Sequence, residues 1–137
     1  MDAHSLISQW SGKIPADSVY TLQEEIKSLS QEKIATLYSL SLKNKFIGLV
    51  LGLFLGGLGV DRFYKGDKRL GVYKLTLMCV YIVVLSIGGA LGSQVIAGFG
   101  GILGLVVTIW AITDLFLVWR GIPKDNLTKI RQAILGY

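Results

Sequence analysis

Residues 75–119 form a 45-residue stretch that contains a single charged side chain, Asp114. A continuous α-helix of this length would measure about 67 Å, because the helix rises about 1.5 Å per residue. The hydrocarbon core of a bilayer is only about 30 Å thick. The stretch is therefore too long for a single membrane crossing, and the chain must turn within it.

The turn is expected at residues 88–94, Gly-Gly-Ala-Leu-Gly-Ser-Gln. It divides the stretch into two predicted membrane helices, 70–90 and 95–119. A third apolar segment, 44–60, has 17 residues, which would give about 25 Å of helix. That length is close to the lower limit for a membrane span. We expect this segment to cross the membrane, and the alternative is a re-entrant or tilted hairpin.

The composition agrees with a membrane protein. Of 137 residues, 52% are hydrophobic and 17% are charged, whereas about 25% are charged in a typical soluble domain. We predict an all-α integral membrane protein with about three membrane helices and an N-terminal amphipathic helical region. The expected parts are that amphipathic region (1–42), a membrane domain (43–120) and a basic amphipathic tail (121–137).

Both ends of the chain show the apolar spacing of helices. In the N-terminal region a helix is predicted to start at Thr21, which fits a capping box with Glu24. We expect this helix to pack on itself or on a surface, and a partner-binding helix is the alternative. The tail repeats the spacing, which predicts a helix on the membrane surface. The apolar positions are Val19, Leu22, Ile26 and Leu29 in the first region, and Leu127, Ile130 and Ile134 in the tail.

The net charge of +5 is unevenly distributed. Residues 1–45 hold five basic and five acidic side chains, so the excess lies in the remainder. Because the predicted hairpin returns to its starting side, the loop 61–69 and the tail share one face of the membrane. The positive-inside rule predicts that this face is cytoplasmic. The expected membrane is a plasma or bacterial inner membrane. If 44–60 crosses, residues 1–43 lie on the opposite side. The basic residues of the shared face are Arg62, Lys65, Lys68, Arg69, Lys74, Arg120, Lys124, Lys129 and Arg131.

Glycines recur at four-residue spacing in the apolar segments. Such ridges allow helices to approach closely in lipid. We expect them to pack helices within one chain, and homo-oligomerisation is the alternative. A phosphate-binding loop is excluded, because no Lys-Ser or Lys-Thr pair follows these glycines. The ridge residues are Gly48, Gly52, Gly56, Gly88, Gly92, Gly100 and Gly104.

Asp114 is a candidate functional residue, because an acidic side chain in an apolar membrane segment is costly unless it has a partner. It lies six residues before Arg120, about 9 Å along the helix, and hence near the cytoplasmic boundary. The predicted hairpin brings this level close to Arg62. We therefore predict a bidentate ion pair between Arg62 and Asp114 that ties the loop to the last helix.

These motifs together resemble the TM2 domain family. The resemblance covers residues 43–119 and combines a glycine-rich helix, the motif Gly-Gly-Leu-Gly-Val-Asp-Arg-Phe-Tyr-Lys-Gly and a late acid after a tryptophan. It implies a small integral membrane protein with two membrane helices and no agreed biochemical activity. This chain departs from that pattern, because its second apolar region is long enough for two helices. The matching positions are Gly56, Gly57, Gly59, Asp61, Arg62, Phe63, Tyr64, Gly66, Trp110 and Asp114.

The residues do not favour an enzyme. The single histidine, His4, lies outside the membrane segments, so no Ser-His or Cys-His arrangement is expected there. Cys79 lies in an apolar run, and we expect neither a metal nor a cofactor. We predict a non-enzymatic interaction or scaffold protein whose loop and tail engage anionic lipid headgroups or a cytoplasmic partner, with no nucleic acid bound. The alternative is an oligomeric pore-forming or membrane-perturbing protein assembled through the glycine ridges.

Overall fold

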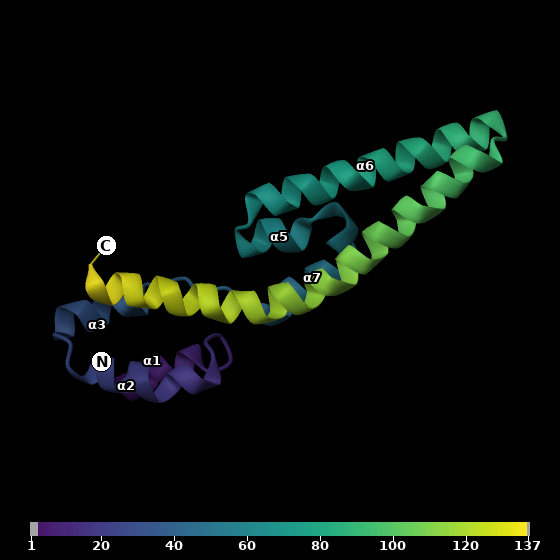
Figure 1. The fold of residues 1–137 in the computed structure, drawn as a ribbon. Helices are drawn as coiled ribbons and strands as arrows, with labels where there is room; N and C mark the ends of the chain where they lie inside the picture. Colours follow the sequence, from purple (N-terminus) through teal and green to yellow (C-terminus); the bar gives the residue numbers. More distant parts are fainter. Residues whose placement is uncertain (1–2, 137) are drawn as a thin grey trace. The chain divides into compact units, whose positions relative to one another are not determined.

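The structure is a computed structural model that describes residues 3–136, and these residues form helices and turns without any strand. The chain divides into two compact units, whose helices are labelled in Figure 1. The membrane unit is Phe46–Trp119. The terminal unit combines Met1–Lys45 with Arg120–Tyr137, so it is built from both ends of the chain.

The terminal unit is a small helical bundle with one hydrophobic core. Apolar residues at helical spacing give each helix one face to bury, and the faces meet in this core. Its helical segments are α1 (Ala3–Trp10), η1 (Ala16–Ser18), α2 (Val19–Lys27), α3 (Gln31–Tyr38) and the C-terminal part of α7 (Gln94–Leu135). The most completely buried core side chains are Leu6, Trp10, Leu22, Ile26, Leu37 and Ile130.

The N-terminal helices begin at other residues than the sequence predicts. α2 starts at Val19, so Thr21 lies inside the helix, and the N-cap residue Ser18 makes no side-chain capping bond. The expected capping box is therefore absent. The next helix, α3, does have a capping side chain, because the hydroxyl of Ser30 accepts a hydrogen bond from the backbone N–H of Lys33. Ser30 is thus the N-cap residue of a second short helix, α3.

The tail differs from the predicted surface helix. α7 continues through Pro123 to Leu135, although proline disfavours a helix interior. Ile130 lies in the core of the terminal unit, with Leu127 and Ile134 packed partly buried against it. Burial of this apolar face stabilises the helix beyond what its sequence predicts. The tail is thus part of the same unit as the N-terminal helices, rather than a separate segment.

Asn126 links the two chain ends by hydrogen bonds. Its side-chain oxygen accepts from the backbone N–H of Lys43 at 3.0 Å, and its amide donates to the carbonyl oxygens of Lys13 and Lys43 at 2.8 Å each. The side chain is almost inaccessible to solvent. A buried amide requires such partners, so these bonds fix the tail against the segment that precedes the membrane unit.

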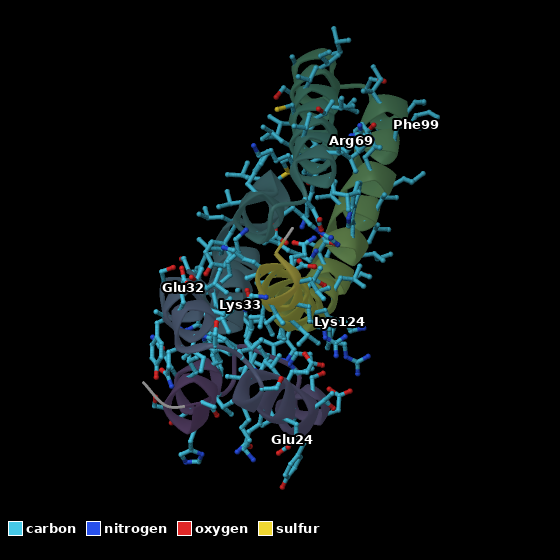
Figure 2. All side chains as sticks on the ribbon, turned by 90° about the vertical axis from the view of Figure 1, so that its left-hand side faces the viewer. Glu24, Glu32, Lys33, Arg69, Phe99 and Lys124 are labelled. Carbon is cyan, nitrogen blue, oxygen red and sulfur yellow. The ribbon has the colours of Figure 1, made fainter. Side chains whose placement is uncertain are left out.

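The membrane unit contains two helices that are long and apolar enough to cross a membrane, α6 (Lys68–Leu91) and α7. Most of their large apolar side chains are exposed, and Phe99 projects outward from α7 in Figure 2. Exposed apolar surface of this extent suits lipid rather than water. Together with the shorter apolar helix α4 (Lys45–Leu55), these helices confirm the predicted all-α membrane fold.

The predicted turn between the two long helices is confirmed. α6 ends at Leu91, Gly92 has a positive φ of 60°, and α7 begins at Gln94. The backbone N–H groups of Gly92 and Ser93 donate to the carbonyl oxygens of Gly89 and Gly88. This pattern is a Schellman motif, which requires a left-handed residue and therefore favours glycine. The helices run antiparallel from this turn (Figure 1).

The segment 44–60 is not the continuous helix that the sequence predicts. α4 has only 11 residues, about 16 Å of helix, and it is followed by the short 3₁₀ turn η2 (Gly56–Leu58) and by α5 (Val60–Lys65). Gly59 between them has a φ of 74°, and a Cβ atom there would lie 2.6 Å from the carbonyl oxygen of Gly71. Close contact with α6 therefore requires glycine, and this left-handed residue separates η2 from α5.

Candidate functional site: a buried charge cluster

Six charged side chains gather inside the membrane unit, and we call them the charge cluster. Three come from α5, one from the turn before α6, one from α6 and one from α7. Two left-handed glycines shape the turn, because Gly59 precedes α5 and Gly66 ends it. The members are Asp61, Arg62, Lys65, Asp67, Lys74 and Asp114.

Arg62 makes the ion pair that the sequence predicts. Its Nε donates to Oδ2 of Asp114 at 3.0 Å, and its Nη2 donates to Oδ1 of the same carboxylate. This two-point contact joins α5 to α7 with the planar geometry that favours arginine over lysine. The third nitrogen, Nη1, donates to Oδ2 of Asp67 at 2.8 Å. Arg62 thus fixes the turn before α6 as well as the last helix.

Lys74 occupies the centre of the charge cluster, and only 2% of its side chain is exposed. Its ammonium group lies 2.7 Å from Oδ2 of Asp114 and 3.2 to 3.3 Å from the two carboxylate oxygens of Asp61. Both aspartates are fully buried. Lys74 therefore bridges a carboxylate from α5 and one from α7, and it joins both to α6.

Asp67 forms the outer edge of the charge cluster. Its Oδ2 accepts from Arg62 and from Lys65, each at 2.8 Å, and about a third of its side chain is exposed. Burial alone would raise the pKa of this carboxyl group. The hydrogen bonds from Lys65 and Arg62 outweigh that effect and hold the pKa of Asp67 below its ordinary value.

The charge cluster is balanced, with three carboxylates and three cations. Among residues 3–136, no buried side-chain nitrogen or oxygen lacks a hydrogen-bond partner. A buried charge is tolerated only when it is paired and hydrogen-bonded, so each member depends on its neighbours. In the same range, no group of three or more histidine, cysteine, aspartate or glutamate side chains is placed to hold a metal ion.

The other predicted motif residues lie on η2, α5 and α7. The ring of Phe63 packs on α6 at Gly71, where a Cβ would lie 3.0 Å from the ring. Trp110 is half-buried and lies one helical turn before Asp114. Tyr64 is half-buried on α5, and Gly56 is buried in η2. Phe63 thus takes part in the packing of α5 against α6.

Several ridge glycines pack helices within the membrane unit. A Cβ at Gly52 would lie 2.7 Å from the side chain of Leu115, and one at Gly100 would lie 2.7 Å from that of Leu85. Gly104 faces the ring of Tyr81 and Gly88 faces the backbone of Ala97 in the same way. Gly48 is buried in α4, whereas a Cβ at Gly56 or Gly92 would meet open space.

Three members of the charge cluster, Lys65, Asp67 and Lys74, are not among the site residues that the sequence predicts. The sequence places Lys65 and Lys74 only among the basic residues of one membrane face, whereas the ammonium group of Lys74 binds two carboxylates in the structure. A signal was present, because Lys74 is the last charge before 39 uncharged residues and Asp114 is the next one. Ionisable groups inside membrane segments pair with one another, so such a lysine and such an aspartate are natural partners.

Residues 41–92 match the family model described as the TM2 domain. This segment is therefore similar to a TM2 domain. It contains α4, α5 and α6, and hence five of the six cluster residues, whereas Asp114 lies beyond it on α7. No curated protein and no solved structure matches the chain. The matched segment thus binds a carboxylate from a further helix, because Arg62 and Lys74 both donate to Asp114.

Proposed function

We propose that this TM2-domain protein is a non-enzymatic membrane scaffold, in which a helical hairpin anchors the terminal unit at the cytoplasmic face. The observation that carries the proposal is the shared core of the terminal unit, in which Ile130 from the tail packs with residues of α1, α2 and α3. A folded unit of this kind offers a surface for cytoplasmic partners. The charge cluster supports a structural role, because its charges bind one another.

Sidedness follows from the connections of the chain. α6 and α7 run in opposite directions, so the residues before α6 and the residues after position 119 lie on one side of the membrane. Residues 1–45 share a core with 120–137, which supports the same side for both. The segment 46–60 then enters and leaves the membrane on one face. The short length of α4 and the helix break at Gly59 support this re-entrant alternative over a crossing.

The cytoplasmic orientation rests on the basic residues. The turn at 92–93 has no charge, whereas nine basic residues lie in the loop, the first turns of α6 and the tail. Translocation of so many basic residues is unfavourable, so this side is assigned to the cytoplasm. The membrane itself is a plasma or bacterial inner membrane in this proposal.

Cysteine accessibility tests the topology. In a Cys79→Ser background, single cysteines at the exposed positions Ser28, Lys68 and Gln132 are expected to react with an impermeant probe from the cytoplasmic side. A cysteine at Ser93 is expected to react from the other side. Reaction of Ser28 from the same side as Ser93 would show that 46–60 crosses the membrane and would contradict the proposal.

The alternative function, an oligomeric pore, is tested by ion flux through liposomes that contain the purified protein. Gly88, Gly100 and Gly104 are occupied by contacts between α6 and α7, which supports the scaffold over assembly through these ridges. We expect flux no greater than in empty liposomes. Protein-dependent flux that is lost in Gly52→Leu would overturn the scaffold in favour of the pore.

A further inference from the structure

We propose that Lys68 and Arg69, at the start of α6, form a binding site for the headgroup of an anionic phospholipid. The inference rests on the proposed function, since it requires this end of α6 to lie at the lipid headgroups. Of the nine basic residues in the loop, α6 and the tail, only these two form the proposed lipid site.

The membrane unit has two more basic than acidic side chains. The unit contains five basic residues, of which Arg62, Lys65 and Lys74 bind the three carboxylates of the charge cluster. Their charges cancel within the protein. The remaining charge of +2 therefore belongs to Lys68 and Arg69, which make no ion pair with any of the described residues.

The position of the pair suits a phosphate at the membrane surface. Both side chains are exposed on the first turn of a helix that is apolar over the following residues. The positive end of the helix dipole adds to their charge and favours an anion. The neighbouring carboxylate of Asp67 accepts hydrogen bonds from Arg62 and Lys65 rather than from Lys68 or Arg69.

Aromatic side chains mark the same level of the membrane. Tyr73 lies one helical turn after Arg69, on the same face of α6, and 62% of it is exposed. Phe63 is 40% exposed beside the same helix. Aromatic rings of this kind favour the boundary between headgroups and acyl chains. A phosphate bound by the two cations would thus have its acyl chains beside apolar residues of α6, which favours a phospholipid over a free anion.

The test measures lipid retention by the full-length protein in detergent, using native mass spectrometry with phosphatidylglycerol and phosphatidylcholine in equal amounts. We expect a preference for phosphatidylglycerol that Lys68→Gln/Arg69→Gln reduces about five- to thirtyfold, the factor expected for two basic residues near an anionic headgroup. The matched control is Lys124→Gln/Arg131→Gln, which removes the same charge from exposed positions of the terminal unit. It is expected to keep the preference.

Three outcomes would overturn the lipid site. They are an unchanged preference in Lys68→Gln/Arg69→Gln, an equal loss in the control variant, and displacement of the lipid by an equal concentration of inorganic phosphate. Thermal unfolding of both variants should match the parent protein, because neither pair belongs to the charge cluster. The cysteine map and the flux assay report on the scaffold separately, so a failed lipid site with an intact topology leaves the proposed function standing.

Discussion

At the scale of single residues, the charge cluster separates into parts that are each neutral. Asp61 has hydrogen bonds only to Lys74 among the cluster residues, whereas Asp114 is also held by Arg62. Removal of Asp61 together with Lys74 therefore leaves two carboxylates and two cations. Removal of either alone leaves an unbalanced charge in a buried position, which is far more costly.

We predict that Lys74→Met lowers the free energy of unfolding by about 3–5 kcal/mol, because Asp61 loses its cation. The double variant Lys74→Met/Asp61→Leu should recover most of this loss. Equilibrium unfolding in detergent micelles measures both. The exposed substitution Lys68→Met serves as the control and should change stability by no more than about 0.5 kcal/mol. Equal destabilisation in the single and double variants would contradict the separation into neutral parts.

The lowered pKa of Asp67 makes the stability of the folded protein depend on pH. Because this pKa is lowered in the folded protein, the ionised form of Asp67 adds stability above the unfolded pKa of about 3.9. This contribution is lost as the pH falls through the lower pKa of the folded state. The melting temperature should therefore decline below about pH 4, and the decline should be shallower in Asp67→Asn. Parallel pH profiles of the two proteins would refute this role.

At the scale of elements, a comparison of two glycines distinguishes the effect of backbone constraint on stability from that of helix propensity. Gly59 has a positive φ and lies against the backbone of Gly71, whereas Gly89 lies within α6 with open space around it. The first position connects η2 to α5 and fixes both against α6. The second has no such constraint.

Gly59→Ala is expected to lower the free energy of unfolding by more than about 2 kcal/mol, because alanine is strained at this φ and would collide with a carbonyl oxygen. Gly89→Ala is the matched control, and it should be neutral or stabilising by up to about 1 kcal/mol, since alanine favours a helix. Unfolding in detergent compares the two. Similar effects of both substitutions would contradict the close approach of α5 and α6.

At the scale of the whole molecule, the terminal unit depends on a contact between residues far apart in the sequence. Ile130 is fully buried among side chains of the first 45 residues. Truncation of this side chain would leave a cavity in the core that the N-terminal helices share. A change in the tail should therefore loosen the other end of the chain.

We expect Ile130→Ala to destabilise the terminal unit by about 2–5 kcal/mol, the range for such truncations in a packed core. Trypsin should then cleave faster at lysines within residues 1–45. Gln132→Ala, an exposed change on the same helix, provides the control. An unchanged cleavage rate in the N-terminal region would show that the two chain ends do not stabilise each other.

The sequence by itself determined the helical membrane class, the turn near Gly92 and the pair of Arg62 with Asp114. Each depends on local composition or on one strong physical cost, namely the burial of charge and of unpaired backbone in lipid. The segment 44–60, predicted as one helix, is interrupted in the structure by η2 and Gly59. Spacing along the chain carries no information on which distant residues will pack together.

The tertiary structure alone decided the role of Lys74, the close contact of Gly59 with Gly71 and the shared core of both chain ends. Lys74 and Asp67 become part of the site only when α5, α6 and α7 bring their partners within hydrogen-bond distance. The tail joins the N-terminal helices because burial of Ile130 in a shared core is more favourable than exposure of its apolar face. These features arise from contacts between segments that are remote in sequence, and only folding determines which of those contacts form.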